Sequence, residues 1–498
     1  MIRQKIKKLL SEKVKGEVIV DSNPVFGDYS TNAAKRAGLD EKELISQLGK
    51  IDDFERIEAK NGFINFYLSK KYLYSQIKEL LKEKGFPLDL GKGKKVQVEF
   101  ISANPTGPLT LGNGRGGFCG DVLANVLEKA GYKVEREYYV NDRGGQIEKL
   151  GETLLGKEVF YKGKYIEELK RQVKGKNPDK AGKKAADIIL KKMIKPTVKK
   201  MGIEFDVWFS ERKLYKKKKV EKVLKELKEK NLVYEKEGAL WLRTSQFTDG
   251  KDRVLKKSNK EETYLASDAA YFKDKMERKF DLVINFWGAD HHGYVERYKS
   301  MVQALGYSEK TWHVILMQLV KLFKEGKEMR MSKREGVFTT LDELIDEVGV
   351  DVSRFFFLMR NYNSHLNFDL DLAKEKSEKN PVFYVQYAYA RIFSILKKSK
   401  SRFNSEKLEL LKEPQEIALM KKIIKLPEVL EDICSDFQVH RLTLYSRELA
   451  SLFHQFYTEC RVLGEKELTE ARLALVESTK IALKTVLDIM GISSPEKM

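Results

Sequence analysis

The residues between Glu99 and Arg115 have the types and spacing needed to bind the phosphates of a nucleotide. An apolar run is followed by a segment rich in asparagine, proline and glycine, and then by four glycines between 112 and 117. The pattern from Val122 to Leu127 is typical of a helix. A strand, a glycine-rich turn and a helix in this order place backbone N–H groups and a helix N-terminus against phosphate. A turn without a ligand is the alternative.

A second segment could act on the same phosphates. Glu328 to Gly336 has the sequence EMRMSKREG, with Lys333 in its centre. A lysine on a loop can close over phosphate groups and neutralise the charge that develops as one departs. Alone, such a basic loop is usually solvated surface. Its place at the far end of a nucleotide-binding pattern favours a catalytic role.

The hydrophobic pattern predicts the scaffold that would position these segments. An alternating strand is expected at 134–140 and an apolar strand at 282–286, separated by helical patterns. This order is typical of a doubly wound α/β sheet of the Rossmann type, in which residues just past a strand's carboxyl end face the ligand. Candidates at such positions are Tyr139, Asn141, Asp142 and Gln146.

The chain of 498 residues is too long for one hydrophobic core, and we expect several domains. The predicted division is a small α+β N-terminal domain at 1–90, the first half of the Rossmann-type domain at 95–150, a basic connective insertion at 151–260, the second half with the Lys333 loop at 261–376, and an all-α C-terminal domain at 377–498.

The basic charge is concentrated in the middle of the chain. The formal net charge is +20, and the segment 151–260 has 32 lysines and arginines against 16 acidic residues. Such runs are by default solvated helix faces. The excess also suits a polyanion such as a nucleic acid.

Cysteine content and hydropathy limit the possible cofactors and the location. Cys119, Cys434 and Cys460 are far apart, so neither a zinc site nor a disulfide framework is expected. Few cysteines fit the reducing cytoplasm. No segment approaches membrane-spanning length and no signal peptide is evident, so we predict a cytoplasmic protein without a membrane partner.

The string SANPTGPLTLGNGR at 102–115 resembles the first signature of class I aminoacyl-tRNA synthetases, in the form used by arginyl-tRNA synthetases. The Lys333 segment resembles their KMSKS loop. Further matches are GDYSTN at 27–32, YYVNDRGGQI at 138–147, MGIEFDVW at 201–208, WGADHHGY at 287–294 and NPVFYVQYAYAR at 380–391. The resemblance implies a ligase that joins L-arginine to tRNA(Arg) through an arginyl-adenylate made from ATP, with release of AMP and pyrophosphate.

This chain departs from the family at the first signature. Thr110 and Asn113 stand where the family has two histidines. A hydroxyl and an amide can still donate hydrogen bonds to phosphate, but they supply no imidazolium charge. A loop that has lost activity is the alternative.

The resemblance implies an ATP site on the two signatures. Thr110, Gly112, Asn113 and Lys333 are the expected catalytic residues. ATP contacts are expected from Pro105, Gly107, Thr110, Leu111, Gly112, Asn113, Gly114, Arg330, Met331, Ser332 and Lys333. Mg²⁺ would accompany ATP, and no other metal is expected.

The resemblance also implies an arginine pocket. A planar guanidinium with five N–H donors requires carboxylates placed edge-on to it. The matching positions are Glu99, Ser102, Asn104, Asn113, Tyr264, Asp268 and His292. A structural ion pair is the alternative for Glu99, because it lies in an otherwise apolar strand. A metal site is the alternative for the adjacent His291 and His292.

The C-terminal unit is expected to bind the anticodon loop. Tyr384 and Tyr387 share a helix face, which is core more often than not, but unpaired bases stack on such rings. The resemblance adds Arg391 and the terminal Met498, and it implies a monomer. Two alternatives stay open: an RNA-binding protein without catalysis, and a class I synthetase for another amino acid such as cysteine.

Overall fold

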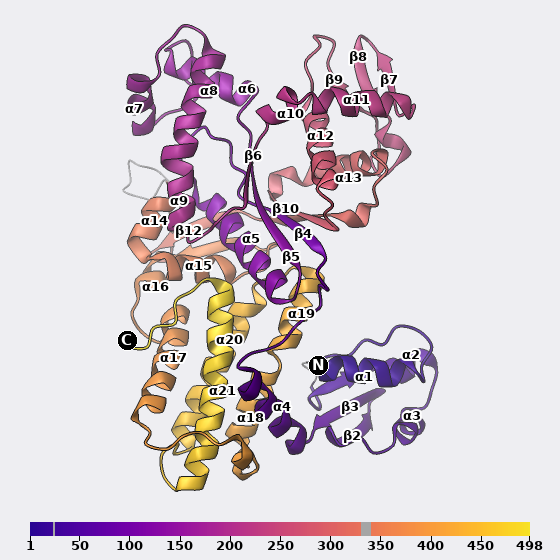
Figure 1. Cartoon of the computed structure of the whole chain (residues 1–498), viewed down its shortest axis with the longest axis vertical. Coiled ribbons are helices and arrows are strands. Elements are labelled where there is room, and N and C mark those ends of the chain that lie inside the picture. The colour runs from indigo at the N-terminus through magenta and orange to yellow at the C-terminus, as the bar shows by residue number, and fades with distance from the viewer. Residues whose placement is uncertain (23–24, 330–339) are drawn as a thin grey trace.

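The computed structural model describes residues 1–22, 25–329 and 340–498. Arg330, Met331, Ser332 and Lys333, predicted to act on ATP, lie outside this range. Figure 1 shows a sheet in the middle of the molecule, two lobes above it, and a helical bundle and the small N-terminal unit below it.

The N-terminal unit is a three-stranded antiparallel sheet in the order β1-β3-β2, covered by helices. Its elements are α1 (Ile2–Ser11), β1 (Tyr29–Thr31), α2 (Ala33–Ala37), α3 (Glu41–Leu48), β2 (Phe54–Lys60), β3 (Phe63–Leu68) and α4 (Lys70–Glu83). Gly27 has a φ of +78°, and a Cβ there would lie 2.9 Å from the Phe66 carbonyl oxygen. The next residue, Asp28, pairs with Lys421 of the helical bundle at 2.7 Å. The GDYSTN turn therefore links this unit to the bundle.

The central sheet is parallel, with the order β11-β10-β4-β5-β6. Its strands are β4 (Lys95–Glu99), β5 (Lys133–Val140), β6 (Val207–Ser210), β10 (Leu282–Gly288) and β11 (Trp312–Met317). The chain builds outward from β4 first in one direction and then in the other. The crevice at the carboxyl ends of β4 and β10 is where such folds bind ligands. The predicted doubly wound sheet is confirmed.

The glycines between 112 and 117 lie in a helix, whereas we predicted a turn. Helix α5 (Leu111–Lys129) begins before them. A Cβ at Gly117 would lie 2.4 Å from Met201 Cε, and one at Gly120 would lie 2.4 Å from the Phe100 ring. These glycines let α5 approach the end of β4 closely, a tertiary requirement that outweighs their poor helix propensity.

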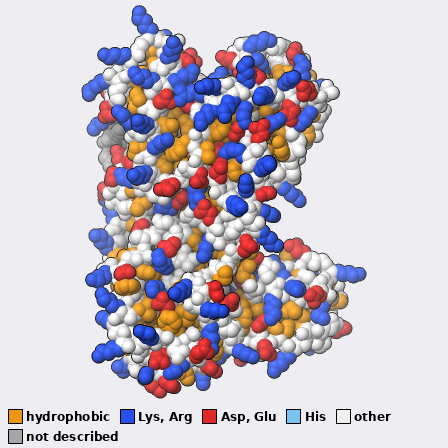
Figure 2. Space-filling model, in the orientation of Figure 1, with side chains coloured by type: hydrophobic (Ala, Val, Ile, Leu, Met, Phe, Trp, Pro, Cys, Tyr) orange, Lys and Arg blue, Asp and Glu red, His pale blue; other side chains and the backbone are white. Residues whose placement is uncertain are grey.

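The segment 151–260 contributes to the central sheet as well as to the lobes. Strand β6 lies inside it, and Trp208 of β6 stacks on Tyr138 of β5 with ring centres 4.5 Å apart. The first lobe has α6 (Gly145–Leu154), α7 (Lys164–Gln172), α8 (Pro178–Ile189) and α9 (Lys195–Lys200). The second has α10 (Arg212–Lys216), α11 (Lys219–Glu229), β7 (Val233–Lys236), β8 (Ala239–Leu242) and β9 (Arg253–Lys256), packed on α12 (Tyr264–Glu277) and α13 (Val295–Ala304). On the face in Figure 2, Lys and Arg side chains gather on both lobes and between them.

The remaining elements complete the core and form the bundle. They are β12 (Val320–Lys324), β13 (Lys327–Met329), α14 (Leu341–Val348), α15 (Val350–Leu358), β14 (Leu366–Asp369), α16 (Leu370–Lys374), α17 (Pro381–Lys398), α18 (Pro414–Ile424), α19 (Leu426–Asp436), α20 (Arg441–Glu459) and α21 (Lys466–Met490). The buried Arg354 joins three parts: it pairs with Asp121 of α5 at 2.8 Å and donates to carbonyl oxygens of Met201 and Met490. Among the described residues, no helix is long and apolar enough to cross a membrane.

Candidate active site

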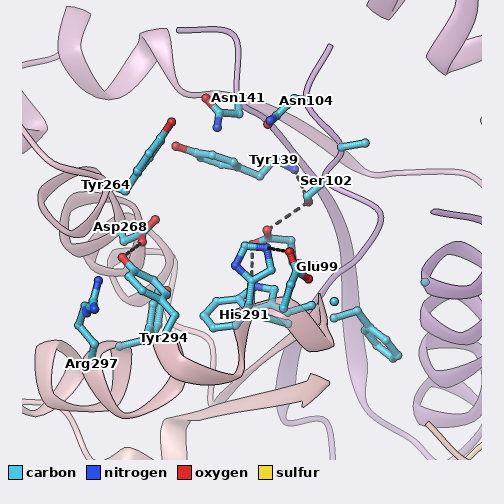
Figure 3. Close-up of a pocket in the computed structure, with 18 of the residues that line it drawn as sticks. Glu99, Ser102, Asn104, Tyr139, Asn141, Tyr264, Asp268, His291, Tyr294 and Arg297 are labelled. Atoms are coloured by element: carbon cyan, nitrogen blue, oxygen red, sulfur yellow. Dashed lines mark hydrogen bonds and ion pairs between the residues drawn. The ribbon is translucent and has the colours of Figure 1, made fainter. Parts of the chain in front are cut away.

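A cavity of about 1480 Å³ opens at the carboxyl ends of β4, β5 and β10. Helices α5 and α12 and the sheet β7–β9 complete its walls. Figure 3 shows Glu99 and Asp268 on opposite sides of it, on β4 and α12. Of the predicted site residues, the cavity brings together Glu99, Ser102, Asn104, Thr110, Gly112, Asn113, Tyr264 and Asp268.

Glu99 is buried and its charge is balanced by Lys275. Its Oε2 accepts from Lys275 Nζ at 2.6 Å and from Asn285 Nδ2 at 2.8 Å. The Asn285 amide is held in this orientation because its Oδ1 accepts from Trp312 Nε1. Oε1 accepts from the Ser102 hydroxyl at 3.1 Å. The ion pair that we considered as an alternative for Glu99 is therefore present, and it leaves Oε1 with room for another donor.

Two further carboxyl groups hold protons unusually tightly. Burial raises the pKa of Asp268 to about 7, although Tyr294 donates to it at 2.5 Å, and the nearby Glu99 raises it further. Burial likewise raises the pKa of Glu211 to about 7, with a contribution from Asp268. A cation that binds between Asp268 and Glu211 would therefore stabilise the charged form of both carboxyl groups.

The backbone bends sharply where β4 ends. Ile101 and Ser102 have φ values of +65° and +40°. A β-branched residue rarely adopts the left-handed region, and such strain is concentrated at functional sites. The bend lets the Ser102 hydroxyl accept from the Tyr139 backbone N–H at 3.0 Å while it donates to Glu99. It thereby fixes one wall of the cavity.

Thr110 and Asn113 form a defined pair at the N-terminus of α5. Asn113 Oδ1 accepts from the Thr110 backbone N–H at 2.9 Å and from its hydroxyl at 3.0 Å. These bonds fix the amide and leave Nδ2 free to donate elsewhere. The altered signature thus keeps an oriented amide donor at a helix N-terminus, where Thr110 and Asn113 form a capping box.

A second cavity of about 560 Å³ is lined by the signature loop and by residues of the first lobe. Asn104, Thr110 and Asn113 line both cavities. Gly107 and Tyr165 line this cavity, and the Tyr165 hydroxyl donates to the Thr106 carbonyl oxygen. Pro105 is next to Thr106 in the chain but is not among the lining residues.

Four predicted positions lie elsewhere. Both His291 and His292 are exposed, but only His291 is among the residues that line the main cavity, because neighbours on the 3₁₀ turn Ala289–Tyr294 point in different directions. Asp142 is buried and pairs with Arg212 at 2.8 Å, so it holds the chain after β5 in place. Leu111 is fully buried, and a Cβ at Gly114 would lie 2.7 Å from Leu341. The Leu111 side chain and the Cβ position of Gly114 therefore face the hydrophobic core.

The predicted aromatic face of α17 is partly open to solvent. Tyr387 is 37% exposed and stacks on Phe383 and His454. Arg391 lies over the rings of Tyr387 and Tyr457, 5.2 and 5.0 Å from their centres. Met498 is also exposed. These side chains could stack with further rings.

Known families match this chain along almost its whole length. Residues 1–68 match the arginyl tRNA synthetase N terminal domain, 76–159 and 153–367 the class I (R) tRNA synthetase catalytic domain, and 385–498 the DALR anticodon binding domain. The arginine–tRNA ligase of Carboxydothermus hydrogenoformans is 45% identical over 95% of this chain and 92% of its own length. The chain belongs to the arginyl-tRNA synthetase family. The enzyme of that name from Aquifex aeolicus is 40% identical over both full lengths. The Thermus thermophilus arginyl-tRNA synthetase has the same fold, with a TM-score of 0.81 at 22% identity over both full chains.

Our sequence reasoning missed two charged residues of this arginyl-tRNA synthetase site. Glu211 lines the cavity, and the buried Lys275 pairs with Glu99 behind its wall; neither belongs to the residues that we expected there. Lys275 lies seven residues after Asp268, two helical turns along α12, so helical spacing could have found it. Among the described residues, no group of three or more His, Cys, Asp or Glu side chains could hold a metal ion.

Proposed function

We propose that this protein joins L-arginine to tRNA(Arg) in two steps. The arginine carboxylate attacks the α-phosphate of ATP, which gives arginyl-adenylate and pyrophosphate, and the terminal adenosine hydroxyl of the tRNA then takes the arginyl group and releases AMP. The observation that carries this proposal is the cavity itself, with carboxyl groups at one end and the α5 N-terminus at the other. The residues act by positioning and by stabilising charge.

The acidic end suits a guanidinium. Glu99 Oε1, Asp268 and Glu211 offer acceptors on three elements, and Tyr264 and Asn104 line the same space. We assign Glu99, Ser102, Asn104, Tyr264 and Asp268 to arginine, with His291 in place of His292. Lysine carries one compact ammonium and cannot satisfy separate carboxylates in the same way.

The α5 end suits the phosphates of ATP. Asn113 Nδ2, the Thr110 hydroxyl and the backbone at Gly112 lie beside the helix N-terminus, which attracts anions. Mg²⁺ would be bound by the ATP phosphates and would shield their charge. Lys333, Arg330, Met331 and Ser332 remain predicted partners of ATP, as do the backbone groups at Pro105, Gly107, Leu111 and Gly114.

We expect Asn113→Asp to slow adenylate formation by about 10²-fold while the protein keeps its melting temperature. Aspartate retains the acceptor that caps Thr110 but loses the N–H donor and places a negative charge near phosphate. The rate would be measured as arginine- and tRNA-dependent exchange of pyrophosphate into ATP. Asn113→His serves as the comparison and should stay active. A normal rate in Asn113→Asp would remove Asn113 from the catalytic residues.

We expect arginine binding to weaken as the pH falls from 8 to 6. The raised pKa of Asp268, about 7, means that this carboxyl takes up a proton over that interval, while guanidinium stays charged. The raised pKa also means that the charged form destabilises the fold above pH 7, and bound arginine offsets this cost. Titration calorimetry in buffers with different ionisation heats should show protons released on binding near pH 7. Affinity independent of pH would contradict this expectation.

The helical bundle suits the anticodon loop of tRNA. Tyr384, Tyr387, Arg391 and Met498 offer rings, a guanidinium and a thioether for unpaired bases. The basic lobes of Figure 2 offer a path for the acceptor stem. The domain boundaries given above, a monomeric state and a cytoplasmic location belong to the same proposal.

We expect Tyr387→Ala to raise the KM for tRNA about tenfold, because one exposed stacking ring contributes roughly 1–3 kcal/mol. The KM for arginine should not change. Phe403→Ala is the control, since this exposed ring lies beyond the other end of α17. Equal effects of the two variants on tRNA KM would argue against a specific surface at Tyr387.

The proposal is tested by charging total tRNA with labelled arginine, ATP and Mg²⁺, with lysine and cysteine in parallel. We expect charging with arginine alone. Charging with another amino acid would overturn the assigned substrate. Tight tRNA binding without any charging would indicate an RNA-binding protein that has lost catalysis.

A further inference from the structure

Lys275 is a completely buried cation next to the proposed arginine pocket. Its side chain has 0% exposure, and Nζ lies 2.6 Å from Glu99 Oε2 and 4.2 Å from the centre of the Tyr271 ring. Lysine is almost never fully buried unless it is paired. Among the described residues, Glu99 is the acid within ion-pair distance of it. The pair is therefore a built part of the site.

The contacts make the two oxygens of Glu99 unequal. Oε2 is surrounded by Lys275 Nζ, Asn285 Nδ2 and the Tyr271 hydroxyl, at 2.6, 2.8 and 3.0 Å. Oε1 has the Ser102 hydroxyl at 3.1 Å. A carboxylate offers about four acceptor positions. A ligand can therefore reach Glu99 through Oε1, with a single hydrogen bond.

The pair also acts on Asp268 across the cavity. Glu99 raises the pKa of Asp268, and Lys275 lowers it. The two charges partly cancel at Asp268, so burial remains the largest cause of its raised pKa.

We propose that Lys275 is a positioning residue for arginine specificity: its ammonium neutralises Glu99 and turns Oε1 toward the guanidinium, so that Asp268 supplies the unbalanced negative charge. This inference rests on the proposed function. It goes beyond the expected carboxylate pair, because one of the two carboxylates is already neutralised within the protein.

The groups that face Asp268 come from every element packed around it. They are Glu99 on β4, Tyr139 on β5, Glu211 before α10, Lys275 on α12, Tyr294 after β10 and Tyr298 on α13. Arg297 on α13 also lines this cavity and lies over the Tyr294 ring, whereas Lys275 is the cation whose charge lowers the pKa of Asp268.

The test measures the KM for arginine between pH 6 and 9 in the wild type, Lys275→Met, Glu99→Gln and the double variant. The pH midpoint is the pH at which the KM is twice its value at high pH. In Lys275→Met, the pH midpoint should rise by about one unit, because the cation that lowers the proton affinity of Asp268 is gone. A shift of that size lowers arginine affinity about ninefold at pH 6, about fivefold at pH 7 and little at pH 9. In Glu99→Gln the midpoint should fall, and affinity at pH 9, where Asp268 is charged in both proteins, should drop about 30-fold because a charged hydrogen bond is lost. The double variant should return the midpoint toward that of the wild type.

Lys273→Met is the matched control. Lys273 lies on the same helix but pairs with Glu226, away from the cavity, and its removal should leave the midpoint unchanged. A merely structural role for Lys275 would lower the melting temperature without moving the midpoint, and that result would overturn the inference. If Lys275→Met does not fold, the inference still requires a lowered midpoint in Glu99→Gln and a midpoint near that of the wild type in the charge-balanced double variant, and equal midpoints in those two variants would overturn it. A wild-type protein that fails to charge arginine would instead overturn the proposed function.

Discussion

Asp268→Asn should raise the KM for arginine by about 10³-fold, with the KM for ATP nearly unchanged. Asp268 faces the cavity, accepts from Tyr294 at 2.5 Å and supplies negative charge that Lys275 does not neutralise directly. An amide cannot balance a guanidinium, and its NH₂ group competes with the guanidinium donors. Loss of one partner from a buried charge pair costs about 2–5 kcal/mol. Steady-state arginylation kinetics would measure the effect.

Asp290→Asn is the matched control for this variant. Asp290 lines the same cavity, but its side chain is 83% exposed. Its replacement should change the KM for arginine by less than about threefold, because exposed charges contribute little. An equal effect of both variants would mean that the cavity responds to overall charge, and Asp268 would lose its assigned role.

Arg354→Met should lower the melting temperature by roughly 10 °C. The side chain is fully buried and donates to carbonyl oxygens of Met201, Gly202 and Met490 besides its pair with Asp121. Removal of a buried ion-pair partner costs about 3–5 kcal/mol because it leaves the other groups buried and unpaired. For units of this size, 1 kcal/mol corresponds to about 2–4 °C. Scanning calorimetry of the whole chain would measure the shift.

Arg360→Met is the control, since Arg360 is exposed two residues after α15. Its melting temperature should stay within about 2 °C of the wild type. Because Arg354 joins α5, α9 and α21, its loss should also separate the transition of the bundle from that of the central sheet. A single unshifted transition would show that other contacts join these parts.

The sequence predicted the scaffold well because the scaffold depends on local periodicity. The apolar strands, the helices of the bundle and the order along the chain follow from patterns within 10 to 20 residues. The positions Asn104 and Asp268 came from the resemblance to the family, and both line the cavity.

The incorrect predictions share one cause: each depended on three-dimensional geometry that the local sequence pattern does not record. The glycines from 112 to 117 indicated a turn, but the close approach of Met201 and Ile101 to Gly117 requires a small residue inside a helix. Which of His291 and His292 lines the cavity could not be predicted without the geometry of the 3₁₀ turn. Strand β6 was hidden in a basic segment, because its backbone pairing and its aromatic contacts are made with β5, which lies far from it in the sequence.

The sequence by itself determined the family, the doubly wound sheet and the set of residues around the crevice. Those properties are encoded in residue types at fixed spacing. Only the tertiary structure decided how the charges are distributed. Glu99 is neutralised by Lys275 from another element, Asn113 is oriented by Thr110, and Asp268 and Glu211 hold their protons near pH 7. Charge balance depends on distance and burial between residues that are far apart in the chain, and no local pattern records either quantity.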